Sequence, residues 1–170
     1  MIIAVASDHR GLHAKVHLVP ALTAAGHKVE DFGVHTSTAC DYPDLALPAC
    51  MSIMDGKADR AILIDGSGIG MSIVANKLPG IRAAVVHDEL TAEISRRYND
   101  ANALCLAADL LGEELIKRIA KVWLSTDFEN GRHSRRVDKI ILWEKCVFGQ
   151  AGSVSTLLAD FIAKKADINR

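Results

Sequence analysis

The chain has 170 residues, of which 49% are hydrophobic and only 5% are aromatic, and its formal net charge at pH 7 is −1. This length suits one domain with an aliphatic core and is short for two. A near-neutral chain argues against a broad nucleic-acid surface and against a polybasic membrane anchor. Stretches without charge also fall well short of the roughly 20 apolar residues of a membrane span.

Strand-like and helix-like segments alternate along the chain. In chain order we expect a strand at 2–6, a helix at 11–25, a strand at 28–32, a helix at 44–54, a strand at 60–64, a helix at 70–77, a strand at 82–86, a helix at 89–98, a strand at 103–107, and helices at 112–124 and 134–146. This order predicts an α/β fold, a Rossmann-like three-layer sandwich with a parallel five-stranded sheet and helices on both faces. Residues 1–148 are expected to form the domain, and residues 149–170 a helical C-terminal extension that forms an interface.

The amino terminus and the cysteines both indicate a cytoplasmic protein. Met1 leads directly into an apolar run with no basic segment before it, so no secretory signal is expected. The four cysteines show no C-x-x-C spacing, and we interpret them as reduced, mostly buried thiols.

The segment 60–77 carries the strongest functional signal. An apolar strand ends at Asp65, and Gly66, Gly68 and Gly70 follow it on alternate positions. Glycines let the chain turn tightly and bring backbone N–H groups close to a ligand's oxygen atoms. A carboxylate beside such donors suits proton transfer next to a bound oxyanion. The alternative is that Asp65 caps the following helix, although it lies several residues early for that role.

Further polar groups are expected near this loop. Parallel sheets bind ligands beyond the carboxyl ends of their strands, and those ends deliver 7–10, 65–68 and 87–88. The polar group 98–100 and the basic segment 132–136 come from helix ends and loops. Arginines four residues apart share a helical face, and guanidinium groups match phosphate oxygens. In a near-neutral chain, this basic segment indicates one phosphate rather than a polymer of phosphates.

Three histidines, His9, His13 and His17, recur every four residues, a spacing that can hold a metal on one helix face. However, His9 belongs to a loop, and no acidic third ligand stands at a fixed offset. Paired helical histidines do not by themselves define a closed site. We therefore expect no metal site here.

Taken together, these motifs resemble the type B ribose-5-phosphate isomerases and the related galactose-6-phosphate isomerase subunits. The similarity extends from Met1 to about Trp143. Its motifs are Ser7-Asp8-His9-Arg10-Gly11, Asp41-Tyr42-Pro43, Gly66-Ser67-Gly68-Ile69-Gly70, Ala75-Asn76-Lys77, Gly80-Ile81-Arg82, Asn99-Asp100-Ala101-Asn102 and Gly131-Arg132-His133.

The resemblance implies an enzyme that interconverts aldose and ketose phosphates through a cis-enediol, without metal or organic cofactor. It also implies a homodimer, or a dimer of such dimers, with the active site between two subunits. The residues at catalytic positions are Asp65, Ser67 and Tyr98. The residues expected to bind sugar hydroxyls, oxyanion and phosphate are Asp8, His9, Arg10, Tyr42, Gly66, Gly68, Gly70, Asn99, Arg132 and Arg136.

The chain departs from the family pattern at its catalytic and phosphate-binding positions. Asp65 stands where many members have a catalytic cysteine, and Met71 stands where others have a glutamate. A carboxyl group in apolar surroundings can replace either as a base near neutral pH. Tyr98 replaces the ring-opening histidine, and a phenol is a poorer base than an imidazole at pH 7. Asp109 replaces an arginine that commonly contributes to phosphate binding.

These departures leave several interpretations open. Ribose 5-phosphate is the default substrate, but an open-chain tetrose phosphate would need no ring opening. A second interpretation is the non-base subunit of a hetero-oligomeric isomerase of the galactose-6-phosphate type, active only with a paralogous partner. A third is a sugar-phosphate-binding protein that has lost the chemistry.

Overall fold

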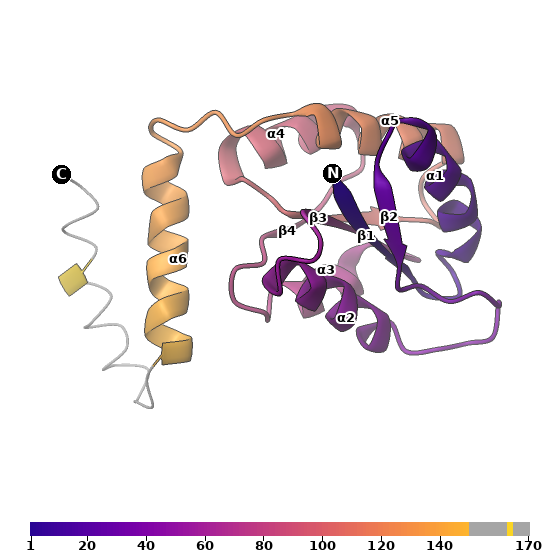
Figure 1. Ribbon diagram of the computed structural model, residues 1–170, viewed down its shortest axis with the longest axis horizontal. Helices are drawn as coiled ribbons and strands as arrows, with labels where there is room; N and C mark the ends of the chain where they lie inside the picture. Colours follow the sequence, from indigo (N-terminus) through magenta and orange to yellow (C-terminus); the bar gives the residue numbers. More distant parts are fainter. Residues whose placement is uncertain (150–162, 165–170) are drawn as a thin grey trace.

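The computed structural model describes residues 1–149 and 163–164. Its strands are β1 (Ile2–Ser7), β2 (Lys28–Asp31), β3 (Arg60–Asp65), β4 (Ala83–Val85) and β5 (Ala103–Ala107). Its helices are α1 (Leu12–Ala24), α2 (Pro43–Met54), α3 (Ile69–Ala75), α4 (Glu89–Asn99), α5 (Glu113–Ser125) and α6 (Ser134–Gly149). All strand pairs are parallel, in the order β2-β1-β3-β5-β4 (Figure 1). The predicted α/β fold with a five-stranded parallel sheet is confirmed.

Helices cover both faces of the sheet because its central strands are apolar on both sides. In β3, the side chains of Ile62 and Ile64 join one buried cluster, and those of Ala61 and Leu63 join another. All four residues are fully buried, as the continuous apolar run of a central parallel strand requires.

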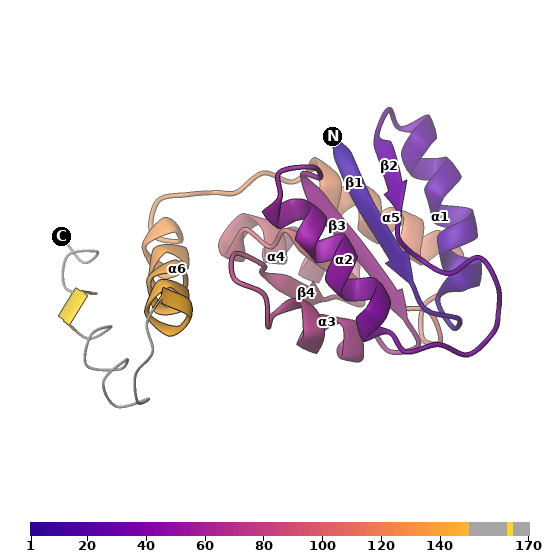
Figure 2. The same ribbon diagram turned by 60° about the horizontal axis from the view of Figure 1, so that its bottom comes forward.

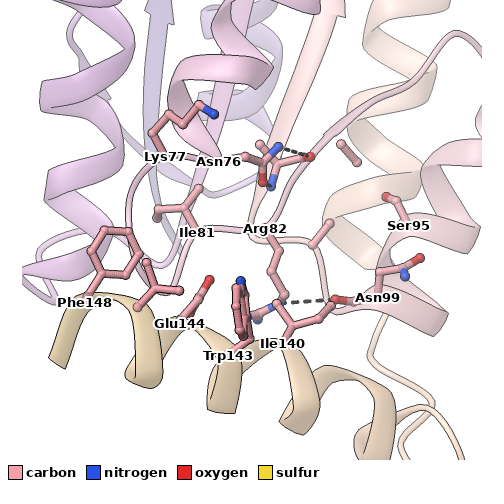
Figure 3. Close-up of a pocket in the computed structure, with 14 residues that line it drawn as sticks. Asn76, Lys77, Ile81, Arg82, Ser95, Asn99, Ile140, Trp143, Glu144 and Phe148 are labelled. Carbon is pink, nitrogen blue, oxygen red and sulfur yellow. Dashed lines mark hydrogen bonds between the residues drawn. The ribbon is translucent and has the colours of Figure 1, made fainter. Parts of the chain in front are cut away.

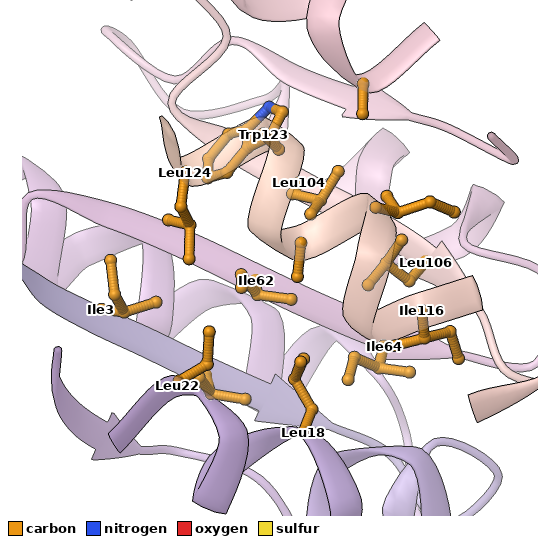
Figure 4. Close-up of a cluster of buried hydrophobic side chains, with 14 of the residues drawn as sticks. Ile3, Leu18, Leu22, Ile62, Ile64, Leu104, Leu106, Ile116, Trp123 and Leu124 are labelled. Carbon is orange, nitrogen blue, oxygen red and sulfur yellow. The ribbon is translucent and has the colours of Figure 1, made fainter. Parts of the chain in front are cut away.

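The two faces differ in the size of their side chains. On one face α1, α4 and α5 pack with large aliphatic residues and the buried Trp123 (Figure 4). On the other face α2 and α3 pack mainly through alanines, with Leu63 and Met71 among the larger residues. Small side chains let α2 and α3 approach the sheet closely.

Because α4 and α5 run antiparallel to the strands, the ends of these two helices lie at the amino edge of the sheet. Arg60, the first residue of β3, donates hydrogen bonds to the carbonyl oxygens of Trp123 and Leu124 at 3.0 and 3.2 Å. Arg96, near the end of α4, places its guanidinium 5.8 Å from the centre of the Trp123 ring. The loops that follow the strands lie at the opposite, carboxyl edge. This arrangement decides which of the expected site residues can meet.

Helix α6 stands beside the rest of the domain, on the side of the sheet that ends in β4 (Figures 1 and 2). The backbone N–H of Gly80 donates to Glu144 of this helix at 2.9 Å, and Trp143 and Glu144 of α6 line a pocket together with Ile81 and Arg82. Apart from residues 149 and 163–164, the C-terminal extension expected at 149–170 lies outside the described residues. Within the described part of the chain, no helix is long and apolar enough to cross a bilayer.

Candidate active site

A pocket of 410 Å³ opens at the carboxyl edge of the sheet. The loops after β1, β3 and β5 meet there, together with residues that begin α2 and α3. Its lining residues are Asp8, Tyr42, Asp65, Gly66, Ser67, Gly70, Asp109 and Leu110. The sequence analysis assigned no role to Leu110, because nothing in the chain order shows that β5 lies beside β3. The pocket gathers most of the expected site residues from the first half of the chain.

Asp65 lies at the floor of this pocket, and its side chain is buried. One carboxylate oxygen accepts hydrogen bonds from the backbone N–H groups of Ser67, at 2.9 Å, and Gly68. The other accepts from the N–H of Met71 at 2.9 Å. Gly68 has a φ of 77°, a left-handed conformation that glycine adopts without strain and that folds the loop around the carboxylate.

These three hydrogen bonds offset the cost of burying the carboxylate, since N–H donors stabilise negative charge on its oxygens. The sequence analysis expected the N–H groups of the glycine loop to bind a ligand oxyanion. In this structure they bind the Asp65 carboxylate instead. Asp65 therefore lines the pocket and also organises the start of α3. The two roles that the sequence suggested for Asp65, a carboxylate in the ligand pocket and a cap of the following helix, are therefore compatible in space.

The loop after β1 is built in a similar way around Asp8. One oxygen of the buried Asp8 side chain accepts hydrogen bonds from the N–H groups of Arg10 and Gly11, both at 2.9 Å. A side chain at Gly11 would overlap the backbone carbonyl of Ile64, so the loop approaches β3 as closely as glycine allows. This contact brings the β1 and β3 loops to one wall of the pocket.

Tyr42 closes the pocket over α3. A Cβ atom at Gly70 would lie 2.8 Å from Cζ of the Tyr42 ring, a distance that no side chain at position 70 can accept without displacing the ring. The Tyr42 ring therefore packs directly on Gly70, in space that any other side chain at position 70 would occupy. His9 points toward another part of the same loop region, with its Nδ1 3.8 Å from Sγ of Cys40.

Charge in the pocket is dominated by carboxylates. Nε of Arg10 donates to Oδ2 of Asp109 at 2.7 Å, and this ion pair raises the pKa of Arg10. The same Asp109 oxygen lies so close to Gly66 that a Cβ there would be only 2.6 Å away. Asp8 and Asp65 also line the pocket. Since Arg10 is already paired, a phosphate dianion would meet net negative charge here.

Three of the remaining expected site residues, Tyr98, Arg132 and Arg136, form a second cluster around His133. Tyr98 stacks on the His133 ring, with centroids 4.4 Å apart and an interplanar angle of 7°. Nε of Arg132 donates to His133 Nε2 at 3.3 Å, and Arg136 approaches His133 Nδ1 at 3.5 Å. The guanidinium of Arg97 covers Tyr98 at 5.5 Å from the ring centre. The sequence analysis gave His133 no role beyond its motif, and only the stacked rings reveal its position.

The two clusters lie at opposite edges of the sheet within one chain. Asp88 caps the start of α4 at the carboxyl edge, whereas Tyr98 lies near the end of this helix at the amino edge. A helix of 11 residues is about 16 Å long. The backbone N–H of Glu129 donates to the carbonyl of Arg97, which holds the segment that leads to Arg132 at the same amino edge. One chain therefore does not bring Asp65 together with Arg132.

Asn99 faces a different and larger hollow of 580 Å³ between α6 and the region from α3 to α4 (Figure 3). Its backbone carbonyl accepts a hydrogen bond from Nε of Arg82 at 3.2 Å. Apolar side chains of α6, including Trp143 and Phe148, form the other wall. We assign the candidate active site to the smaller pocket, because that pocket has a buried carboxylate beside a hydroxyl and a turn of backbone N–H donors.

Comparisons with known proteins found related sequences and related folds. The sequence model of the ribose/galactose isomerase family matches residues 3–140. Ribose-5-phosphate isomerase B of Escherichia coli is 40% identical over 143 residues, which cover 84% of this chain and 96% of that protein. The D-erythrulose-4-phosphate isomerase of Pectobacterium atrosepticum is 40% identical over 143 residues, or 84% and 94% of the two chains. The solved structure of Clostridium thermocellum ribose-5-phosphate isomerase B has a TM-score of 0.84 at 43% identity and covers 85% of this chain and 98% of that one.

Proposed function

The chain belongs to the ribose/galactose isomerase family, and we propose that it is an aldose–ketose isomerase that acts on a sugar phosphate of the ribose 5-phosphate type. The resemblance inferred from the sequence motifs is confirmed by the family match. The observation that carries the proposal is the buried carboxylate of Asp65 in a pocket at the carboxyl edge, inside the part of the chain that the family match spans.

The reaction needs a base that moves a proton between C2 and C1, and Asp65 fits this role. A carboxylate offers about four acceptor sites. Three backbone N–H groups fill three of them, so one site remains for a proton from the substrate carbon. As Asp65 accepts this proton it loses its charge, while the substrate oxygen gains charge as the cis-enediolate forms.

As the charge moves from Asp65 to the substrate oxygen, the glycine loop can stabilise the substrate oxyanion as well. The N–H groups of Ser67 and Gly68 can transfer their hydrogen bonds from the neutralised Asp65 to the new oxyanion, because donors favour the more negative acceptor. Ser67 lines the same pocket. Its hydroxyl carries the hydroxyl proton between the substrate oxygens on C1 and C2. Protonated Asp65 then returns its proton to the neighbouring carbon.

The second cluster enters the site from another copy of the chain. We infer a homodimer in which Tyr98, Arg132 and Arg136 of one subunit complete the Asp65 pocket of the other. The arginines supply the positive charge that a phosphate needs and that the carboxylate-rich pocket lacks. Large exposed apolar side chains next to the pocket support such an interface: Ile69 and Ile73 on α3, and Leu110 after β5.

A second candidate substrate is an open-chain tetrose 4-phosphate such as erythrulose 4-phosphate. The observation in its favour is Tyr98, which lies flat on His133 where a ring-opening base would be needed for a cyclic sugar. A tetrose whose 4-hydroxyl is esterified cannot close a furanose ring, so it needs no such base. One relative that is 40% identical carries the name D-erythrulose-4-phosphate isomerase.

A panel of four-, five- and six-carbon sugar phosphates tests the activity. In D₂O the enzyme should incorporate deuterium at C1 or C2 of at least one aldose–ketose pair, and kcat/KM should decide between ribose and erythrulose phosphates. A protein that only binds sugar phosphates, or one that needs a paralogous partner, would show no exchange when purified alone.

A mixing experiment tests the shared site. Asp65→Asn and Arg132→Ala subunits, each inactive alone, are unfolded together and refolded. If each site uses both subunits, random mixing makes half of the dimers mixed, and each mixed dimer has one intact site, so about a quarter of the wild-type activity returns. If each site lies within one chain, mixing restores nothing.

A further inference from the structure

Two exposed histidines and a glutamate from distant parts of the chain converge outside the active site. His13 and His17 lie one turn apart on α1, and Glu113 is the first residue of α5. Nδ1 of His13 is 2.9 Å from one carboxylate oxygen of Glu113, and Nδ1 of His17 is 3.7 Å from the other. One ligand atom from each residue lies within 4.8 Å of the other two.

We propose that these three side chains bind a divalent zinc-type cation, Zn²⁺ itself being the reference ion. Imidazole nitrogen and carboxylate oxygen are ligands that Zn²⁺ prefers, and bonds of about 2.0–2.2 Å place neighbouring ligand atoms roughly 3.3 Å apart in a tetrahedron. The present distances need only small side-chain rotations. Three protein ligands leave the fourth position to water, as the exposure of His13 and His17 allows.

The sequence alone argued against this site, because no acidic residue stands at a fixed offset from the histidines along α1. Glu113 lies far along the chain, and the packing of α1 against α5 on the same face of the sheet supplies it. The i, i+4 spacing then holds both imidazoles on the side of α1 that faces the start of α5.

Nearby charges do not oppose a cation. Arg10 is paired with Asp109, and Lys117 is paired with Glu114 at 2.8 Å, so both cations have carboxylate partners of their own. The carboxylate of Glu113 contacts both imidazoles.

A bound ion would clamp the first turns of α1 to α5. Helix α1 begins directly after the loop that Asp8 organises at the active-site pocket. The clamp is therefore a structural element beside the reaction rather than part of it, and it does not depend on the proposed activity.

Binding of Zn²⁺ to the full-length, tag-free protein tests the proposal by calorimetry. We expect one ion per chain. Variants His13→Gln and His17→Gln should each lower the affinity for Zn²⁺ at least about tenfold. Loss of a residue that only hydrogen-bonds to a metal ligand already lowers metal affinity by about that factor. At 100 times the wild-type dissociation constant, Zn²⁺ should raise Tm of the wild type by about 5–10 °C and Tm of each histidine variant by no more than about half of that.

Matched controls use neighbours outside the cluster. The exposed Val16→Ala on α1 and the exposed His35→Gln should bind Zn²⁺ as the wild type does. Co²⁺ should give visible absorption bands that both cluster variants lose, and circular dichroism verifies that these variants are folded. The proposal is overturned if the wild type binds no Zn²⁺. It is also overturned if binding survives both histidine changes, or if Cys40→Ser removes it instead.

Discussion

Replacement of Asp65 by asparagine tests both roles of this side chain at once. Asparagine keeps the shape of the side chain and one carbonyl oxygen, which can still accept from the N–H groups of Ser67 and Gly68. Its NH₂ group, however, faces the N–H of Met71, where the carboxylate had accepted a bond. Two donors then oppose each other in a buried position.

The expected cost follows from these contacts. Loss of a hydrogen bond to a charged group costs about 1.5–3 kcal/mol, and an unsatisfied buried N–H costs about 1–3 kcal/mol. The free energy of unfolding should therefore fall by roughly 3–5 kcal/mol. Since domains have about 5–15 kcal/mol of stability, most of the variant should remain folded at 25 °C.

Activity should fall much further than the folded fraction. Loss of a general base typically lowers the rate by about 10²–10⁴-fold. Urea unfolding followed by circular dichroism measures stability, and kcat is then expressed per folded molecule. Leu18→Ala is a matched control, because its side chain is buried in the core away from the pocket and its loss costs about 2–5 kcal/mol. This control should keep kcat near the wild-type value.

Two results would refute the reasoning. If Asp65→Asn keeps kcat per folded molecule within about threefold of the wild type, Asp65 organises the loop but is not the base. If stability does not change, the three backbone hydrogen bonds do not hold the carboxylate in solution.

Three other predictions follow from single contacts. Gly11→Ala should lower the free energy of unfolding by more than about 3 kcal/mol, because its Cβ would overlap a backbone carbonyl of β3. The control Gly112→Ala, with open space around it, should change this free energy by less than about 1 kcal/mol, and equal effects of the two variants in urea titrations would contradict the packing. Asp109→Asn removes a negative charge from the pocket and should lower KM for the sugar phosphate about threefold to tenfold, while an increase in KM would show that the carboxylate binds substrate. Burial raises the pKa of the Cys50 thiol to about 12, so at pH 8 a thiol reagent should label the half-buried Cys40 and spare Cys50 until urea is added. Fast labelling of Cys50 in the native protein would contradict its burial.

Local sequence signals were sufficient for the elements and for the edge where the pocket lies. The apolar run before Asp65 and the glycines after it predict a buried strand, a tight turn and a helix, and the structure shows β3, the loop and α3 there. Such signals are reliable because strand and helix periodicity and glycine turns depend on residues close together in the chain. The expected strand at 82–86 is shorter in the structure, since the N–H groups of Arg82 and Ala83 bond to asparagine side chains at their end of β4.

Distances between remote side chains were decided only by the tertiary structure. Sheet order places Asp109 beside Asp65, and the antiparallel return of α4 carries Tyr98 to the other edge. Packing of α1 on α5 brings Glu113 to His13. The physical reason is that backbone preference and hydrophobic spacing act within a few residues, whereas the arrangement of strands and helices is selected by burial across the whole core. The sequence by itself therefore determined the fold class, the elements and the chemistry available, and the packing determined which of those groups meet.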